Sequence, residues 1–153
     1  MTQDLHPTLD ALQHMFERDL RVLREEVEAT PDPHLWTVPS GVHNAVGTLA
    51  IHLCGNLEHF VGHLLGGSGY QRDRDAEFAG TPLDKSDVLT RIDACARTVS
   101  QTLDTLPLDM LDQPMPSPPA HHAGRSILFF LIQLHSHLSR HLGQLHYLRR
   151  MLG

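Results

Sequence analysis

Apolar side chains recur every three or four residues over four stretches of this chain, a spacing typical of amphipathic helices. The predicted helices cover, in chain order, about residues 7–29, 45–66, 86–106 and 126–151. Asn44 is the expected N-cap of the second helix, and Gly66 and Gly67 are the expected signal for its end. No segment alternates apolar and polar residues with a period of two, so we expect no sheet.

Four long helices predict an all-α fold, a four-helix bundle with long connections between helices, in a single domain that spans residues 1–153. The connection over residues 66–82 is polar, and the connection over residues 106–125 holds five of the ten prolines. About 20 residues without clear structure is long for a compact domain. The second connection therefore either lines a site or is an ordinary bundle crossover.

The composition is that of a soluble globular chain, since 41% of the 153 residues are hydrophobic and 20% are charged. The net charge of −6 argues against nucleic acid or an anionic membrane as partner, because both bind basic surfaces. The longest apolar run, Ile127–Ile132, is far shorter than the roughly 20 residues that span a bilayer. The N-terminal MTQDLHPTLD has acids where a signal peptide has bases, so we expect a cytoplasmic protein.

Several chemistries lack the residues that they need. Cys54 and Cys95 are too few for a disulfide scaffold and lie on apolar helix stripes, so reduced thiols packed in the core are expected. No Glu has a His three residues later, as a di-iron bundle requires. The glycines of GGSG follow a predicted helix and precede none, which excludes a phosphate-binding loop.

Histidine is frequent in this chain, with 13 His against 12 Lys and Arg together. His137 and His141 lie four residues apart on the fourth predicted helix, so both imidazoles share one face and can bind one metal ion. Apolar residues on the same face indicate that the pair points into the bundle. The alternative is two core histidines that donate to carbonyl groups. His135 and His146 point away from this face and are expected to be solvated or structural.

The second predicted helix offers a third metal ligand. His52, Asn56, His59 and His63 lie near one face of that helix. His52 and His59 are about 10 Å apart along the axis, which is too far for both to bind one ion at Zn–N distances of about 2 Å. Only one of the two can join the pair on the fourth helix, and the spacing does not say which.

Two stretches of the chain carry a likeness to a known family. They are NAVGTLAIHLCGNLEHF, with a His-Leu dipeptide in mid-helix, and HLSRHLGQLHYLRRML, in which two histidines four apart precede Gly-Gln. They resemble the second and fourth helices of the DinB/YfiT-like superfamily of bacterial metal-binding bundles, and YQRDRDAEF is similar to a subgroup whose function is undefined. This resemblance covers most of the chain in order. It implies a metal triad of His52, His137 and His141.

The same resemblance gives roles to neighbouring residues. It leaves His59 as possible pocket lining and makes Asn56 and Gln144 candidates for contacts with the metal ligands or a substrate, with interhelical hydrogen bonding as the alternative. Gly143 is expected to allow close helix packing. The chain departs from the family at Leu142 and in the proline-rich connection, so the resemblance does not extend to the substrate.

Three neutral imidazoles leave one or two positions open around a divalent ion, as in catalytic sites, and Zn²⁺ or Ni²⁺ suits them. Superfamily members include transferases that join a low-molecular-weight thiol to electrophiles, and others are regarded as metal-dependent hydrolases. The resemblance therefore implies an enzyme for a small-molecule substrate, with thiol transfer ahead of hydrolysis, and a homodimer. A non-catalytic bundle that is stabilised by its metal is the alternative.

Overall fold

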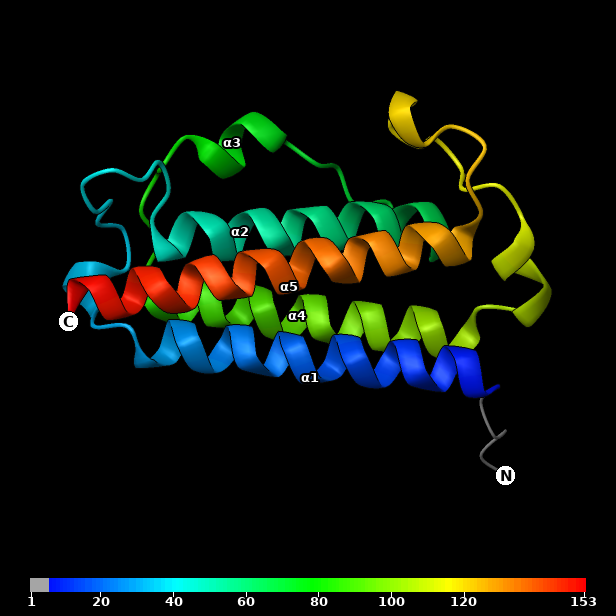
Figure 1. Ribbon diagram of the computed structural model, residues 1–153, viewed down its shortest axis with the longest axis horizontal. Helices are drawn as coiled ribbons and strands as arrows, with labels where there is room; N and C mark the ends of the chain where they lie inside the picture. The colour runs from blue at the N-terminus through cyan, green and yellow to red at the C-terminus, as the bar shows by residue number, and fades with distance from the viewer. Residues whose placement is uncertain (1–5) are drawn as a thin grey trace.

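Four long helical segments run alongside one another in the computed structural model, which describes residues 6–153 (Figure 1). They are α1 (Pro7–Ala29), α2 (Val46–Leu57) with its continuation η2 (Glu58–Leu65), α4 (Lys85–Thr105) and α5 (Ile127–Leu152). The four predicted helices are confirmed, and their ends agree to within one residue. The described residues contain no strand, so this part of the chain is all-helical. Residues 1–5 lie outside the described residues, so the predicted domain boundary at residue 1 and the expectation about an export signal are not tested there.

The apolar stripes of the long helices meet in one core. α1 packs against α4 and α5, and α2 packs against the same two helices. Phe16 and Leu23 of α1, Ile92 of α4 and Leu138 of α5 are almost completely buried there. Burying one face of each helix removes apolar surface from water, which is the main stabilisation that such helices have. Among residues 6–153, none of the helices has both the length and the hydrophobicity needed to cross a bilayer.

Two carboxylates of α1 bind side chains of α5. Asp19 accepts hydrogen bonds from Nε2 of His135 at 2.8 Å and from Oγ of Ser139 at 2.9 Å. Glu26 accepts a hydrogen bond from Nδ1 of His146 at 2.7 Å. His135 and His146 are therefore structural residues, which is one of the two roles expected for them.

α2 begins without the side-chain cap that the sequence predicts. Ala45, not Asn44, occupies the N-cap position, and no side chain caps the helix. The N–H of Gly47 donates instead to the carbonyl of Leu35 at 2.8 Å, so the preceding loop satisfies a donor that a cap would have taken. After Leu57 the helix continues as the π-helix η2, a geometry that the α-helical spacing did not anticipate.

Both long connections contain short helices that periodicity did not predict. α3 (Arg74–Phe78) interrupts the first connection and lies over α2 (Figure 1). η3 (Leu108–Asp112) and η4 (Ala120–His122) lie in the second, and backbone hydrogen bonds join that connection to the first turn of α5. Its attachment point is about 15 Å along α5 from His137. Of the two roles considered for this connection, its position favours the crossover.

Candidate metal centre

Three histidine side chains meet between α2 and α5. The helices α2 and α5 lie side by side (Figure 1). His52 is a residue of α2, and His137 and His141 are on successive turns of α5. Nε2 of His137 lies 3.2 Å from Nε2 of His52 and 3.1 Å from Nε2 of His141. Imidazole nitrogens that bind one tetrahedral zinc ion at about 2.05 Å are about 3.3 Å apart. The cluster could therefore hold a metal ion.

Hydrogen bonds on the far side of two rings determine where their lone pairs point. Nδ1 of His52 lies 3.0 Å from Oε1 of Glu77, and this nitrogen carries the proton because a carboxylate only accepts. Nδ1 of His141 donates in the same way to Oε1 of Gln144 at 2.7 Å. The Nε2 atoms of His52 and His141 are then both unprotonated, and both face Nε2 of His137, which carries at most one proton. Such a surplus of lone pairs around one point suits a cation.

Burial favours the neutral form of this cluster. Burial, with the neighbouring His141 and His52, lowers the pKa of His137 to about 4. Burial also lowers the pKa of His52, although the hydrogen bond and the negative charge of Glu77 oppose that shift. Neutral imidazole is the form that binds metal ions, so near pH 7 these two rings need not lose a proton to bind one.

Glu77 is a functional candidate that the sequence analysis does not predict. Its carboxylate is buried and accepts two hydrogen bonds from Arg72, from Nε to Oε2 and from Nη2 to Oε1, each at 2.9 Å. With the bond from Nδ1 of His52, this carboxylate joins a guanidinium to the cluster and holds the ring in one tautomer. A side chain on a five-residue helix has no periodicity to detect, and the only signal was its place within the segment YQRDRDAEF.

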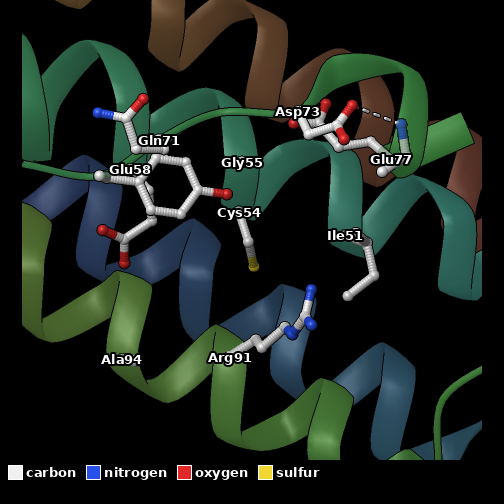
Figure 2. Close-up of a pocket in the computed structure, with 11 residues that line it drawn as sticks. Ile51, Cys54, Gly55, Glu58, Gln71, Asp73, Glu77, Arg91 and Ala94 are labelled. Atoms are coloured by element: carbon white, nitrogen blue, oxygen red, sulfur yellow. Dashed lines mark hydrogen bonds between the residues drawn. The ribbon is translucent and has the colours of Figure 1, made fainter.

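The local backbone explains how Glu77 reaches His52. Asp73 caps α3 by accepting a hydrogen bond from the N–H of Ala76 at 3.0 Å, which is the dashed line in Figure 2. This cap places α3 so that Glu77 lies against Gly55 of α2. A Cβ atom on Gly55 would be 2.0 Å from Oε2 of Glu77, so only glycine leaves room for the carboxylate.

The structure distinguishes the two histidines of α2 and η2 that the spacing left as alternatives. His52 joins the pair on α5, whereas His59 does not belong to the cluster. His59 is half-buried and packs against Phe60 and His63, with ring centroids 4.7 and 6.1 Å apart. Asn56 is buried one turn beyond His52, and its Oδ1 has no hydrogen-bond partner among the described residues.

The cluster is covered by an aromatic ring on the side of α3, whereas its neighbours on α5 are exposed. Phe78 of α3 covers one side of His52, with ring centroids 4.7 Å apart. Gln144 of α5 is exposed and contacts His141. Gly143 is also exposed, and a Cβ atom added to it would meet nothing within 4 Å. The prediction that Gly143 permits close helix packing is wrong, because no atom of another helix among the described residues lies within 4 Å of the position that its Cβ would take.

Comparison with known proteins identifies the family of this chain. No curated protein matches this chain. A family model described as "Protein of unknown function (DUF1572)" matches residues 5–153, which is nearly the whole length. The chain therefore belongs to the DUF1572 family.

Proposed function

We propose that this protein binds one divalent transition-metal ion through the Nε2 atoms of His52, His137 and His141. The observation that carries the proposal is the convergence of these three nitrogens, two of which have lone pairs directed at the third. The helices on which they lie hold them in place, and Glu77 and Gln144 orient two of the rings. The fold in which this site lies is, on this proposal, a DinB-like four-helix bundle.

The donor set favours Zn²⁺ or Ni²⁺, which both suit imidazole ligands. Three neutral ligands leave the full positive charge of the ion in place and at least one coordination position for a substrate. His137 and His141 are only half-buried, so a small molecule can approach the cluster from the solvent.

The activity that we propose is the transfer of a low-molecular-weight thiol to a small electrophilic substrate. A bound divalent ion would stabilise the thiol as its thiolate. The residues beside the cluster favour this reaction over a hydrolysis in which a carboxylate acts as general base. The carboxylate in contact with the cluster, Glu77, already accepts hydrogen bonds from Arg72 and His52 and is not free to take a proton from water. The likeness to thiol-transferring members of the DinB/YfiT-like superfamily supports the same choice.

The metal site is tested by the change His141→Ala. We expect the purified wild-type protein to retain about one Zn²⁺ or Ni²⁺ ion per chain after reconstitution. Loss of a contact that only supports a metal ligand weakens metal binding by roughly 10–100-fold. We expect the variant, which loses a ligand, to bind the metal ion more weakly than that. Elemental analysis and a competition titration with a chromogenic chelator measure both quantities.

The matched control is His146→Ala, which removes a histidine from the same helix that contacts Glu26 and not the cluster. It should retain wild-type affinity. Equal metal content in the wild type and in both variants would show that the cluster is not the metal site.

The proposed reaction is tested separately with the metal-loaded protein, a panel of low-molecular-weight thiols and an electrophile such as monochlorobimane. Thiol conjugation that disappears on chelation and in His141→Ala supports thiol transfer. Hydrolysis of activated esters without thiol conjugation would contradict thiol transfer and favour the hypothesis of a metal-dependent hydrolase. Tight metal binding that raises the melting temperature, with neither reaction, would favour a non-catalytic bundle stabilised by its metal.

A further inference from the structure

Two thiols meet between α2 and α4, away from the histidine cluster. Cys54 of α2 and Cys95 of α4 are both buried, as the sequence predicts for core residues. The Cys95 Sγ–H donates to the backbone carbonyl of Cys54 at 4.0 Å, which places the Cys95 sulfur beside the Cys54 residue on the neighbouring helix. A disulfide needs sulfur atoms about 2.05 Å apart on residues whose side chains point toward each other. Two buried cysteines on packed helices, with the sulfur of one 4.0 Å from the backbone of the other, need only a small side-chain movement to meet this requirement.

The two sulfur atoms differ in their access to solvent. A cavity of about 460 Å³ lies between α2, α4 and the segment around α3, and Cys54 lines it whereas Cys95 does not. In Figure 2 the Cys54 side chain points toward α4, and Arg91 extends from that helix into the same space. The cavity is large enough for a small oxidant to reach Cys54. Cys95 is completely buried behind it, with 0% of its surface exposed.

We propose that Cys54 and Cys95 form a peroxide-sensitive dithiol, in which Cys54 is oxidised first and Cys95 then closes a disulfide between α2 and α4. The proposal does not depend on the metal site. The sulfur of Cys54 attacks one oxygen of a hydroperoxide, which breaks the O–O bond and leaves a sulfenic acid on Cys54 and one molecule of water or alcohol. The sulfur of Cys95 then displaces the hydroxyl group, which leaves as water with the Cys95 proton. Two thiols are oxidised by two electrons, and the peroxide is reduced by two.

The environment of Cys95 fits the second role. The hydrogen bond with Cys54 and complete burial raise the pKa of the Cys95 thiol well above its usual value. Cys95 is therefore protonated in the reduced protein and shielded from external oxidants, and the neighbouring sulfur of an oxidised Cys54 is the electrophile within its reach. Dithiols of this kind in proteins of a reducing compartment serve as redox sensors and not as permanent cross-links.

The test is stoichiometric hydrogen peroxide added to the folded, reduced protein, followed by alkylation in denaturant and intact-mass analysis. We expect both thiols to disappear together within one chain, with loss of two hydrogen atoms and full recovery on reduction by dithiothreitol. Two alkylatable thiols after peroxide treatment, or disulfides only between chains, would overturn the proposal. This measurement needs no variant, so it stands even if a substitution destabilises the fold.

Two variants test the order of the steps. In Cys95→Ser, Cys54 should accumulate as a sulfenic acid that dimedone captures. In Cys54→Ser, Cys95 should remain unmodified, and a dimedone adduct on Cys95 there would overturn the assigned order. Ala94→Leu narrows the cavity and should slow disulfide formation, whereas Ala79→Leu, at an exposed site outside the cavity lining, should not. Equal rates in these two variants would show that the cavity is not the path to Cys54.

Discussion

At the scale of single residues, Glu77 joins His52 of the histidine cluster to Arg72. Its two oxygens are shared between the guanidinium of Arg72 and Nδ1 of His52, so loss of the charge affects both partners. A metal-binding histidine whose second nitrogen donates to a carboxylate has a fixed orientation and a more basic ligand atom. The carboxylate therefore supports a proposed ligand without being one.

The change Glu77→Gln removes the negative charge and keeps the size of the side chain. We expect metal affinity to fall by about 10–100-fold, because the amide is a weaker acceptor for His52 and leaves Arg72 without its ion-pair partner. A chelator competition titration measures the change. Asp75→Asn, on the exposed side of the same short helix, is the control and should leave affinity unchanged. An affinity loss of the same size in both variants would argue for a general effect of charge and against a specific support of His52.

Because the pKa of His137 is low, we expect the stability of the metal-free protein to depend on pH. Its folded-state pKa of about 4 lies below the unfolded value of about 6.5, so between these pH values the unfolded chain binds more protons. The free energy of unfolding should therefore decrease as pH falls from about 6.5 to 4. The lowered pKa values of His52 and His59 add a dependence of the same sign.

Urea denaturation of the metal-free protein at several pH values measures this dependence. His137→Gln should flatten the curve over that range, whereas His14→Gln, at an exposed position on α1, should not. A slope in this range that is unchanged in His137→Gln would contradict the assignment of the proton uptake to His137.

At the scale of elements, two glycines on neighbouring helices differ in whether the structure has room for a larger side chain. Gly55 of α2 lies under Glu77 of α3, whereas Gly143 of α5 faces open space. Glycine in a helix interior costs about 0.5–1 kcal/mol of stability relative to alanine. At Gly55 the packing of α3 against α2 requires glycine in spite of this cost, whereas no contact requires glycine at Gly143.

Gly55→Ala should destabilise the protein by about 1–3 kcal/mol, because the new Cβ atom forces Glu77 and α3 away from α2. It should also weaken metal binding, since His52 loses its support. Gly143→Ala should instead stabilise the protein by about 0.5–1 kcal/mol. Urea unfolding of both variants measures the two free energies. A stabilising Gly55→Ala change would show that α3 does not pack against α2 in the way described.

The expected homodimer belongs to the scale of the whole molecule and stays a prediction. The C-terminal half of α5 presents Tyr147 and Met151, which are 70% and 57% exposed. Sedimentation equilibrium should give about twice the mass of one chain, and Tyr147→Ser should weaken the association if this surface forms the contact. Ile132→Ser, at the other end of α5, is the matched control. A single species of 17.1 kDa at high concentration would contradict the dimer.

Helix existence and extent could be predicted because both depend on local spacing. The stripe from Leu9 to Val27 required no knowledge of partners to indicate α1. The same reasoning placed His137 and His141 on one face. Reasoning from local spacing failed at the start of α2, where Asn44 was the predicted cap. The carbonyl of Leu35, which is distant in the sequence, accepts a hydrogen bond from a backbone N–H that such a cap would have bound.

The sequence by itself therefore determined the four long helices, the faces that they bury and the pair of histidines on α5, since each of these follows from the 3.6-residue repeat of a helix. The helical spacing left His52 and His59 as alternatives, and the family resemblance implied His52. The tertiary structure brings His52 and not His59 to this pair, because the choice depends on the position of α2 along the axis of α5. It also decided that Glu77 and Arg72 support the cluster. Their positions depend on the path of a loop and on the space above Gly55, and neither has a periodic signal in the sequence.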